Sequence, residues 1–568
     1  MEQNNIDEIL SIFFPNNEKE IVKKLFKWLS EGSVAVDIKE FDDKEKEIIK
    51  KFENENHYIV LLKDKVYFQK YLKYEEEIIK KIKEIKENEN TFKEDELKKI
   101  KEQFKKHFFS NNNTIKNEID WQLVAVALGL KKKFFIITGG PGTGKTTTIL
   151  RLLTIKLLLN PDLKIAIAAP TGKAASRVNE SLNNNIKKLD IPNKEKILNI
   201  KAQTIHRLLE ARNDGNFYYN KNNKMPYDLI IIDESSMIDI SLMHKLLISI
   251  KKDASIVLLG DKDQLASVEA GSVFGDLCKS VIDENKNKNI LTENDVKYLK
   301  EIMGNYDFSN YIAQRSNILT GSVIQLEKNY RFSKDSDIGQ LALNVIEGNT
   351  NQEFLNKVFN NEFQKVKFFE TKEKEKDYLK KLYKEFIPND KNDTLNTIQK
   401  IKILCAVKND PKGYDVNHFN LEVEKIIKKD KADKKFYQYK QLILTSNDYE
   451  NNVFNGDIGI IDIINGKPKV IFPAEDGNKK IIDPYRLTNV QTAFAITIHK
   501  SQGSEFDKVI IVLPSSINSK ILNRELLYTA ITRAKNEIVI IGSKDVFKKA
   551  IEQTAFRSSG ITERIKEN

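Results

Sequence analysis

Short apolar runs alternate with amphipathic stretches along most of this chain, from about residue 114 onward. The first group of runs consists of FFIIT (134–138), KIAIA (164–168), LIII (229–232) and SIVLL (255–259). The second group consists of KILCAV (402–407), KVIIVL (508–513) and EIVIIG (537–542). Because buried strands that alternate with helices are typical of a parallel sheet covered by helices, this pattern predicts two α/β domains.

Two further segments have other patterns. Residues 1–112 are rich in Lys, Glu and Asn, with helical spacing in 21–29 and 74–104 and a short hairpin followed by a helix expected over 58–72. Apolar positions in 453–472 surround Asn465-Gly466, a pair that favours a hairpin. We therefore expect four units: a mostly helical N-terminal domain (1–112), a first α/β domain (113–325), a second α/β domain (326–410 and 486–568) and a small β barrel inserted into the second (411–485).

Composition narrows the class of protein only slightly. The 568 residues carry a net charge of +11, which suits an anionic partner such as nucleic acid but is equally common in other soluble proteins. Cys278 and Cys405 stand far apart, which argues against a disulfide framework and a zinc ribbon. No apolar run approaches the roughly 18–20 residues that cross a bilayer, so we expect a cytoplasmic protein without a membrane partner.

The segment GGPGTGKTT (139–147) matches the phosphate-binding pattern GxxxxGK[ST] and joins a predicted strand to a helix. Its glycines let backbone N–H groups surround phosphates, and the helix N-terminus adds partial positive charge. Lys145 is expected to reach the β and γ phosphates of ATP, and Thr146 to bind Mg²⁺. The ATP-binding residues expected here are Gly139, Gly140, Pro141, Gly142, Thr143, Gly144, Lys145, Thr146 and Thr147.

Polar residues also follow the later strands of the first α/β domain. In LIIIDESSM (229–237), Asp233 is expected to complete the Mg²⁺ shell and Glu234 to activate the attacking water. In GDKDQL (260–265), Gln264 is placed to sense the γ phosphate, although an ordinary polar loop has the same composition. Gln122, one helix before the phosphate loop, either reads the adenine edge or is an ordinary exposed glutamine.

ATP hydrolysis also requires positive charge at the transition state, which an arginine finger often supplies. Arg331 in LEKNYRF (326–332) and Arg533 in LLYTAITRAK (526–535) are the candidates for this catalytic role. Both follow the first α/β domain, and each could equally be a surface arginine.

The order of the motifs carries more information than any single motif. GGPGTGKT, APTGKAA (169–175), TIHRLL (204–209), DESSM, GDKDQL, NYRF, TIHKSQGSEFD (497–507) and YTAITRAK follow one another within residues 120–540. This series resembles the superfamily 1 helicases. The resemblance implies an α/β fold with two RecA-like P-loop domains and with ATP bound in the cleft between them.

The resemblance also implies roles for residues outside the phosphate loop. Glu505 would contact the ribose of ATP, and His499 with Gln502 would link the nucleotide to DNA. The residues implied to contact the DNA strand are Thr171, Lys173, Thr204, His206, Thr497 and His499. Lys, Thr and His side chains that bind the backbone suit sequence-independent tracking along one strand.

Three segments narrow the resemblance to RecD-type helicases: SKDSDIGQLALNVIEGN (333–349), NGDIG (455–459) and VYFQKYLKYEEEI (66–78). That type implies a 5′→3′ ATP-dependent DNA helicase subunit that acts on single strands and duplex ends in double-strand break repair and recombination. Its implied partners are RecB-like and RecC-like subunits of exodeoxyribonuclease V. A stand-alone helicase of the same family and a non-catalytic scaffold subunit remain alternatives.

Three finer expectations follow. The loop over about 213–226 forms a short hairpin that is either a strand-separating pin or an ordinary surface hairpin. Residues 1–112 are expected to be a docking domain for a RecC-like partner, with bracing of the first α/β domain as the rival role. Asp457, Asp462 and Lys467 have an order tempting for a nuclease, but barrel strands explain them better, so we expect nuclease activity on a partner subunit.

Overall fold

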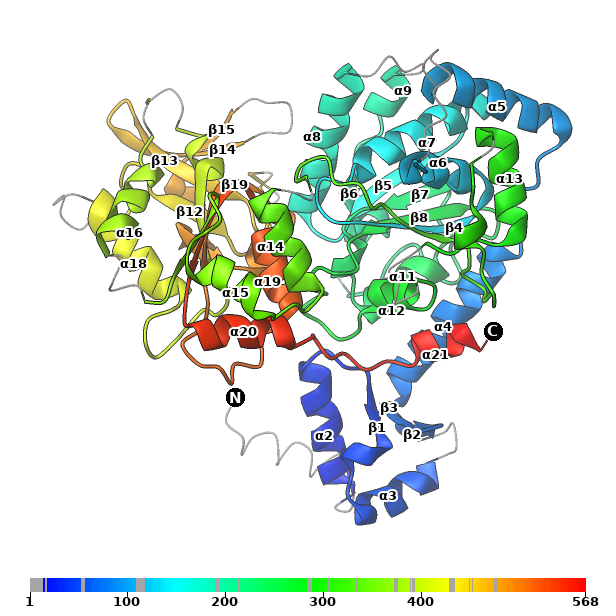
Figure 1. Cartoon of the computed structure of the whole chain (residues 1–568), viewed down its shortest axis with the longest axis horizontal. Coiled ribbons are helices and arrows are strands. Elements are labelled where there is room, and N and C mark those ends of the chain that lie inside the picture. Colours follow the sequence, from blue (N-terminus) through cyan, green and yellow to red (C-terminus); the bar gives the residue numbers. More distant parts are fainter. Residues whose placement is uncertain are drawn as a thin grey trace.

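The computed structural model contains two α/β domains beside each other and a smaller N-terminal unit (Figure 1). It describes residues 14–15, 18–52, 57–108, 118–188, 194–212, 214–282, 289–304, 306–333, 336–371, 376–388, 390, 394–428, 435–448, 450–451, 453–473 and 479–567. The expected boundary at residues 112 and 113 lies outside this set. Among the described helices, none has the length and apolarity needed to cross a membrane.

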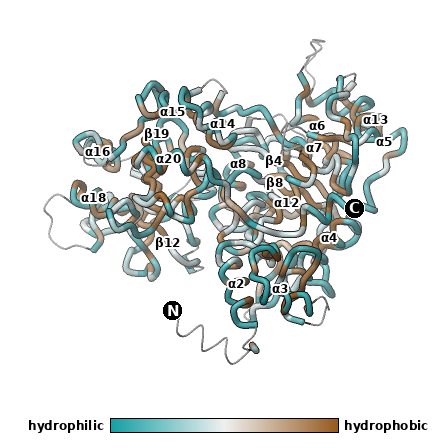
Figure 2. Tube along the Cα trace, turned by 60° about the horizontal axis from the view of Figure 1, so that its bottom comes forward, coloured by the Kyte–Doolittle hydropathy of each residue, from teal (hydrophilic) through white to brown (hydrophobic). Residues whose placement is uncertain are grey.

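The first α/β domain is built on a six-stranded parallel sheet, as the apolar runs predict. Its strand order is β6 (Gln203–Thr204), β5 (Ile165–Ala169), β7 (Leu229–Ile232), β8 (Ser255–Gly260), β4 (Phe134–Thr138) and β9 (Val323–Gln325). The covering helices are α6 (Trp121–Lys131), α7 (Lys145–Leu159), α8 (Gly172–Lys188), α9 (Lys194–Leu198), α10 (Ile205–Leu208), α11 (Ile240–Ile248), α12 (Val273–Lys279) and α13 (Glu293–Met303). Hydrophobic residues follow β4 and β8 through the interior (Figure 2).

The second α/β domain contains a five-stranded parallel sheet. Its strand order is β10 (Val366–Phe369), β19 (Ala534–Ile541), β18 (Phe506–Val512), β11 (Ile401–Cys405) and β17 (Ala495–Thr497). Its helices are α14 (Asp337–Ile346), α15 (Gln352–Phe359), α16 (Lys376–Tyr383), α17 (Thr397–Lys400), α18 (Val416–Ile427), α19 (Arg524–Ile531) and α20 (Lys544–Glu552). Two parallel sheets in one chain confirm the two α/β domains of the expected fold class.

The inserted unit is an antiparallel sheet with the order β15 (Lys479–Ile482), β14 (Lys467–Pro473), β13 (Ile458–Ile464), β12 (Gln441–Leu444) and β16 (Val490–Thr492). Asn465 and Gly466 form its tight hairpin, with φ of 52° and 76°. The described strands leave β15 and β16 as edges, so the sheet is open and a closed barrel is not confirmed. The expected boundaries of 411 and 485 need revision, because α18 packs on β11 and β17 whereas β16 pairs with β12.

The N-terminal unit is less helical than expected. It begins with α2 (Lys19–Ser30), β1 (Ala35–Asp37), α3 (Asp43–Ile49), β2 (Ile59–Leu62) and β3 (Lys65–Phe68). The three strands form an antiparallel sheet in the order β1-β3-β2, and the predicted hairpin within 58–72 is its β2–β3 pair. Ile21, Val22 and Leu25 of α2 lie in a small separate core with residues of these strands, whereas Phe26 of the same helix is exposed.

The two long helices after this sheet belong to the first α/β domain. Helix α4 (Gln69–Lys86) packs on α11, and its residues Ile78, Ile82 and Ile85 are fully buried. Helix α5 (Glu94–Phe108) packs on α13 and α7 from the other face of the sheet. These contacts are the ones that the bracing role requires, and docking of a partner by residues 1–112 stays a prediction.

A truncation tests this bracing. A chain that starts near Asn113 loses α4 and α5, so apolar residues on both faces of the first sheet become exposed to water. We expect that chain to accumulate in the insoluble fraction, whereas a chain that starts at Gln69 stays soluble with a cooperative thermal transition. Soluble, cooperatively folding protein from the Asn113 start would show that neither helix is needed.

The end of the chain leaves the second α/β domain and returns to the first. Helix α21 (Ile561–Lys566) lies against α12 and α4, beside the N-terminal sheet (Figure 1). On the way, the Arg557 guanidinium donates to the carbonyl oxygen of Glu269 (3.2 Å), and the Ser558 amide donates to Ser33 Oγ (3.0 Å). The expected second domain therefore ends near residue 552, and the remaining described residues form a tail that crosses to its neighbours.

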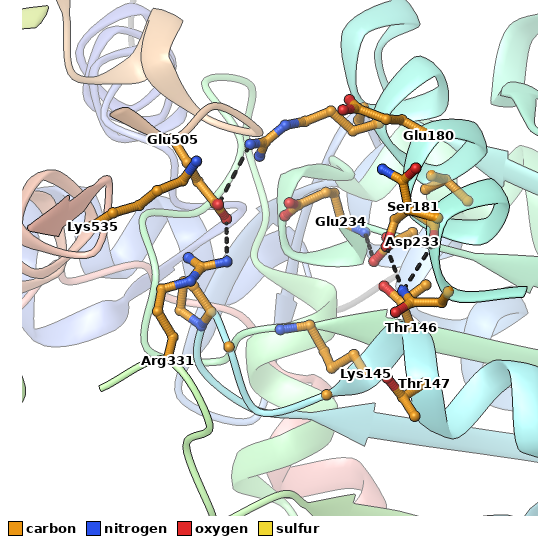
Figure 3. A pocket seen from close by; sticks show the side chains of 18 of the residues that line it. Lys145, Thr146, Thr147, Glu180, Ser181, Asp233, Glu234, Arg331, Glu505 and Lys535 are labelled. Atoms are coloured by element: carbon orange, nitrogen blue, oxygen red, sulfur yellow. Dashed lines mark hydrogen bonds and ion pairs between the residues drawn. The ribbon is translucent and has the colours of Figure 1, made fainter. Parts of the chain in front are cut away.

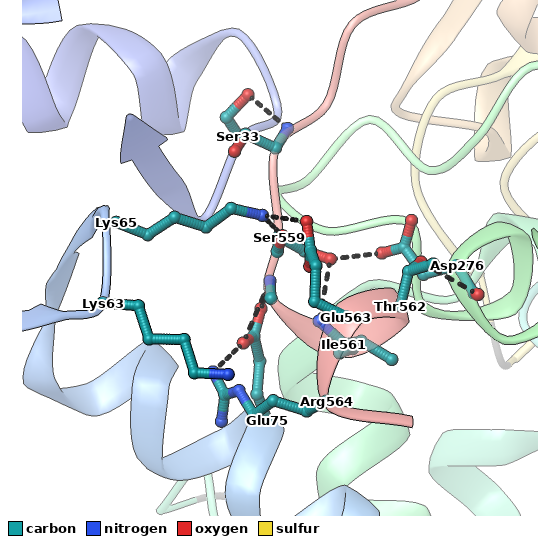
Figure 4. A network of polar contacts seen from close by, with 12 residues as sticks. Ser33, Lys63, Lys65, Glu75, Asp276, Ser559, Ile561, Thr562, Glu563 and Arg564 are labelled. Atoms are coloured by element: carbon teal, nitrogen blue, oxygen red, sulfur yellow. Dashed lines mark hydrogen bonds and ion pairs between the residues drawn. The ribbon is translucent and has the colours of Figure 1, made fainter. Parts of the chain in front are cut away.

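A buried network holds this tail (Figure 4). Arg564 Nη2 lies 2.5 Å from Glu75 Oε2, and Glu75, whose side chain has no exposed area, also accepts from the Gly560 amide (3.1 Å). Ser559 Oγ donates to Asp276 Oδ2 (2.7 Å). Burial raises the pKa of Glu75 to about 7 and that of Asp276 to about 6. The tail is thus fixed by charged groups removed from water.

Candidate nucleotide-binding site and nucleic-acid interface

The phosphate loop joins β4 to α7, as its sequence predicts. Gly142 and Gly144 have φ of 84° and 85°, a left-handed conformation that favours glycine, and Gly144 directly precedes the first residue of α7. Lys145 Nζ donates to the carbonyl oxygens of Gly139 (2.5 Å) and Gly140 (3.2 Å). The loop therefore has the shape that surrounds phosphates, with its lysine lying along it.

The segment after β9 wraps over this loop. The Tyr330 amide donates to the Gly142 carbonyl (2.8 Å), and Asn329 Nδ2 donates to the Pro141 carbonyl (2.9 Å). Asn329 Oδ1 also accepts from the Arg331 amide (2.9 Å). These bonds fasten Arg331 to the phosphate loop itself, which the sequence did not reveal.

Gln122 lies behind the loop and is buried. Its Nε2 donates to the Thr143 carbonyl (2.9 Å), and its Oε1 accepts from Arg151 Nη1 (3.0 Å). A Cβ on Gly144 would come within 2.2 Å of Gln122 Nε2. The alternative of an exposed glutamine is therefore wrong, and reading an adenine edge would require Gln122 to exchange both bonds.

The carboxylates follow β7, at the carboxyl end of the same sheet. Asp233 accepts from the Glu234 amide (2.8 Å). Burial and the charge of Glu234 raise the pKa of Asp233 to about 6, although the charge of Lys145 opposes the shift. Gln264, after β8, donates to Asp261 Oδ2 (2.9 Å). Strand ends of one parallel sheet thus bring these three predicted side chains to one place.

A cleft of about 460 Å³ opens between the two α/β domains at this edge. Predicted site residues that line it are Pro141, Gly142, Gly144, Lys145, Thr146, Thr147, Asp233, Glu234, Gln264, Arg331, Glu505 and Arg533. Other predicted residues surround the cleft without lining it: Gln122, Gly139, Gly140, Thr143 and Gln502. Figure 3 shows Lys145, Arg331 and Glu505 directed toward the same space.

The second domain contributes charged side chains to the cleft. Glu505, just before β18, binds Arg331, with Oε1 and Nη2 2.8 Å apart. Arg533, just before β19, is almost fully buried and donates to the carbonyl oxygens of Thr529 (3.1 Å) and Ser504 (3.2 Å). Burial lowers the pKa of Arg533, although Glu234 and Glu505 oppose that shift. Neither Arg331 nor Arg533 is an ordinary surface arginine.

Gln502 and α19 connect the second domain to the GDKDQL loop. Gln502 Nε2 donates to the Leu265 carbonyl (2.7 Å), and Thr529 Oγ1 accepts from the Leu265 amide (2.9 Å). Tyr528 donates to Asp261 Oδ2 (3.3 Å). The loop that carries Gln264 is therefore bonded to both domains, so movement of one domain can reach it.

Some cleft residues carried no motif that sequence reasoning used. These are Arg177, Glu180, Ser181, Asn184 and Asn185 of α8 and Gln399 of α17. Their positions on one side of α8 depend on how α8 packs against α7 and β5, which the spacing of apolar residues alone does not give. The helical spacing of Arg177, Ser181 and Asn184 could have indicated that these polar residues share one face of α8.

The residues implied to contact DNA lie at the ends of β5, β6 and β17. Thr171 and Thr204 accept from nearby backbone amides at the starts of helices, and Lys173 Nζ donates to the Gly456 carbonyl of the inserted sheet (3.0 Å). Burial lowers the pKa of Lys173 to about 8. Burial also lowers the pKa values of His206 and His499. All three side chains, Lys173, His206 and His499, therefore favour the neutral form more than usual.

The expected hairpin over 213–226 is shorter than predicted. Ala211 and Phe217 form a single antiparallel bridge, and no strand follows in residues 218–226; residue 213 lies outside the described set. Tyr218 is 42% exposed and its ring lies 5.2 Å from the Arg212 guanidinium. FYYN is thus not a strand, and a strand-separating role for this loop stays a prediction.

Comparison with known proteins decides the family. Residues 122–270 match an AAA domain, and residues 492–541 match a UvrD-like helicase C-terminal domain. The chain is 35% identical over 484 residues to the RecBCD enzyme subunit RecD of Haemophilus influenzae, covering 78% of this chain and 72% of that protein. The chain belongs to the RecD family. It is therefore a superfamily 1 helicase, as the motif order implied.

Other proteins similar to this RecD-family chain are more distant. The ATP-dependent RecD2 DNA helicase of Deinococcus radiodurans is 27% identical, over 76% of this chain and 50% of that protein. A crystal structure of Bacteroides Pif1 bound to ssDNA is 16% identical with a TM-score of 0.39, covering 75% of this chain and 93% of that one.

Proposed function

We propose that this RecD-family chain is the ATP-dependent 5′→3′ DNA helicase subunit of a RecBCD-type complex with RecB-like and RecC-like subunits. It acts on single strands and duplex ends in double-strand break repair and recombination. The observation that supports this most is the cleft, which combines a phosphate loop, two carboxylates and arginines supplied from both sides. These groups together can hydrolyse a nucleotide, and groups of both domains contact its phosphates.

Each cleft residue then has a chemical task. Lys145 neutralises the β and γ phosphates, and Glu234 accepts a proton from the attacking water. Arg331 and Arg533 stabilise the charge that develops on the transferred phosphoryl group. Gln264 reports the state of the γ phosphate to the second domain through the bonds of Leu265. Hydrolysis therefore changes how the domains are held, which drives stepping along a strand.

The residues present also suit Mg²⁺. Thr146 and Asp233 both line the cleft, and hydroxyl and carboxylate oxygens are ligands that Mg²⁺ prefers. Bound there, Mg²⁺ would neutralise phosphate charge. Charge of that sign beside Asp233 would also favour its ionised form, against the burial that raises its pKa.

The DNA path is proposed along the strand ends that carry Thr171, Lys173, Thr204, His206, Thr497 and His499. Ends of β5 and β6 come from the first domain and the end of β17 from the second. A strand lying across both would be handed from one domain to the other as the cleft changes. Backbone contacts of this kind are independent of sequence.

A stand-alone helicase of the same family is the second candidate, favoured by the similarity to RecD2. Because the chain is 35% identical to the RecD subunit of Haemophilus influenzae and 27% identical to RecD2, the subunit form is preferred. Purification of the endogenous protein separates the two. Large helicase–nuclease partners are expected to co-purify, and a lone chain would favour the second candidate.

The polarity of unwinding tests the proposal. We expect ATP-dependent unwinding of a duplex with a 5′ single-stranded tail, measured by release of a fluorescent strand, because the chain is placed among RecD-type helicases. A blunt duplex and a duplex with a 3′ tail are the controls. Unwinding from the 3′ tail alone would contradict the proposed direction.

A further inference from the structure

An ion-pair group in the cleft crosses between the two α/β domains. Glu505 of the second domain binds Arg331, and its other oxygen, Oε2, lies 3.7 Å from Nη2 of Arg177 on α8. Figure 3 shows the Arg331 side chain directed toward Glu505, with a dashed line between the two. Both arginines are held by the first domain, Arg177 by its helix and Arg331 by the bonds of Asn329 to the phosphate loop.

Arg331 has binding capacity beyond Glu505. Its Nη1 is buried and has no hydrogen-bond partner among the described residues. Arg331 also lies against the phosphate loop, since a Cβ on Gly142 would come within 2.5 Å of Arg331 Cβ. A guanidinium presents five N–H donors in a fixed plane, so this one is placed for an anion held by the loop.

Glu505 itself is kept ionised. Burial alone would raise its pKa, but the charges of Arg177, Arg331 and Arg533 hold the pKa of Glu505 below its usual value. Arginine binds carboxylate and phosphate oxygens through the same paired N–H groups. A carboxylate and a phosphate therefore compete for one guanidinium.

We propose that Glu505 is an internal anion that competes with nucleotide phosphates for Arg177 and Arg331, with Arg177 as a further phosphate-binding arginine of the cleft. The inference rests on the nucleotide use proposed above. Polyphosphate that enters the cleft takes the two arginines from Glu505 and weakens this link between the domains. When phosphate leaves, the Glu505 pairs form again and favour its release.

The rival role for Glu505 is a contact with the ribose, which the family resemblance implies. The two roles differ for a ligand that has no ribose. Competition predicts that removing the Glu505 charge strengthens the binding of pyrophosphate. A ribose contact predicts no change for pyrophosphate and weaker binding of ADP.

Isothermal titration of the full-length protein with magnesium pyrophosphate tests this. We expect Glu505→Gln to bind it about threefold to tenfold more tightly than wild type, the range for losing a partly exposed ion pair. Glu180→Gln is the matched control, because Glu180 lines the same cleft and loses the same charge. It should change the affinity by less than about twofold, since the Glu180 side chain is exposed and solvent screens its charge.

A double-mutant cycle extends the test to Arg177. Arg177→Gln should weaken pyrophosphate binding, Arg177→Lys should restore part of it, and the gain from Glu505→Gln should shrink when Arg177 is absent. Unchanged or weaker pyrophosphate binding by Glu505→Gln would overturn the inference while leaving the proposed function intact. Wild-type protein that bound no ATPγS would overturn the proposed function and this inference together.

Discussion

Replacing Lys145 with alanine is expected to lower DNA-stimulated ATP hydrolysis by about 100-fold or more, the scale for losing one charge stabiliser at a transition state. The lysine lies along the phosphate loop and lines the cleft. Single-strand binding should persist, because the proposed DNA residues lie on other strand ends. Steady-state ATPase and fluorescence anisotropy with a labelled oligonucleotide measure the two properties.

Lys133→Ala is the matched control for this variant. Lys133 precedes β4 at the end opposite the phosphate loop and donates to the Asp253 carbonyl (3.1 Å). The Lys133→Ala variant should hydrolyse ATP at the wild-type rate. Equal hydrolysis by Lys145→Ala and wild type would refute the assignment of the phosphate loop, and joint loss of ATPase and DNA binding would point to a folding defect.

Arg564→Ala is expected to give the largest loss of stability. It removes the partner of Glu75, whose side chain has no exposed area, and breaking a buried ion pair in this way costs about 3 kcal/mol or more. The midpoint of thermal unfolding should fall accordingly. Lys63→Ala is the control, since the side chains of Lys63 and its partner Glu567 are both more than half exposed. This variant should lower the free energy of unfolding by no more than about 0.5 kcal/mol.

The pH dependence gives this prediction a second readout. The pKa of Glu75 is raised from 4.5 to about 7, so its contribution to stability is fully present below pH 4.5 and is lost as pH rises through 7. Loss of the Arg564 charge raises that pKa further. The stability gap between wild type and Arg564→Ala should therefore widen as pH rises through 7, and a gap independent of pH would contradict the account.

Local patterns in the sequence predicted the parts of the molecule that depend on neighbouring residues. The phosphate loop, the strand ends at Asp233 and Gln264, and the Asn465-Gly466 turn each depend on a few consecutive positions. The cleft between two sheets followed from the order of the motifs. These features need no knowledge of how distant segments pack.

What the sequence did not reveal depends on contacts between distant segments. Glu75 and Arg564 are 489 residues apart, and no periodic pattern links them. The apolar face of α4 has the same spacing whether it covers its own small core or α11, so the docking and bracing roles could not be separated. Arg177 was missed for the same reason, because its neighbour Glu505 comes from another domain.

The C-terminal tail gives the two α/β domains a second connection. The second α/β domain is joined to the first by the chain after β9, and again by the tail, which is fastened at Arg557. Only residues 553–556 separate that point from the end of α20, so the five steps from Glu552 to Arg557 span at most about 17 Å when fully extended. The length of these four residues therefore limits how far the two α/β domains can separate and how wide the cleft can open.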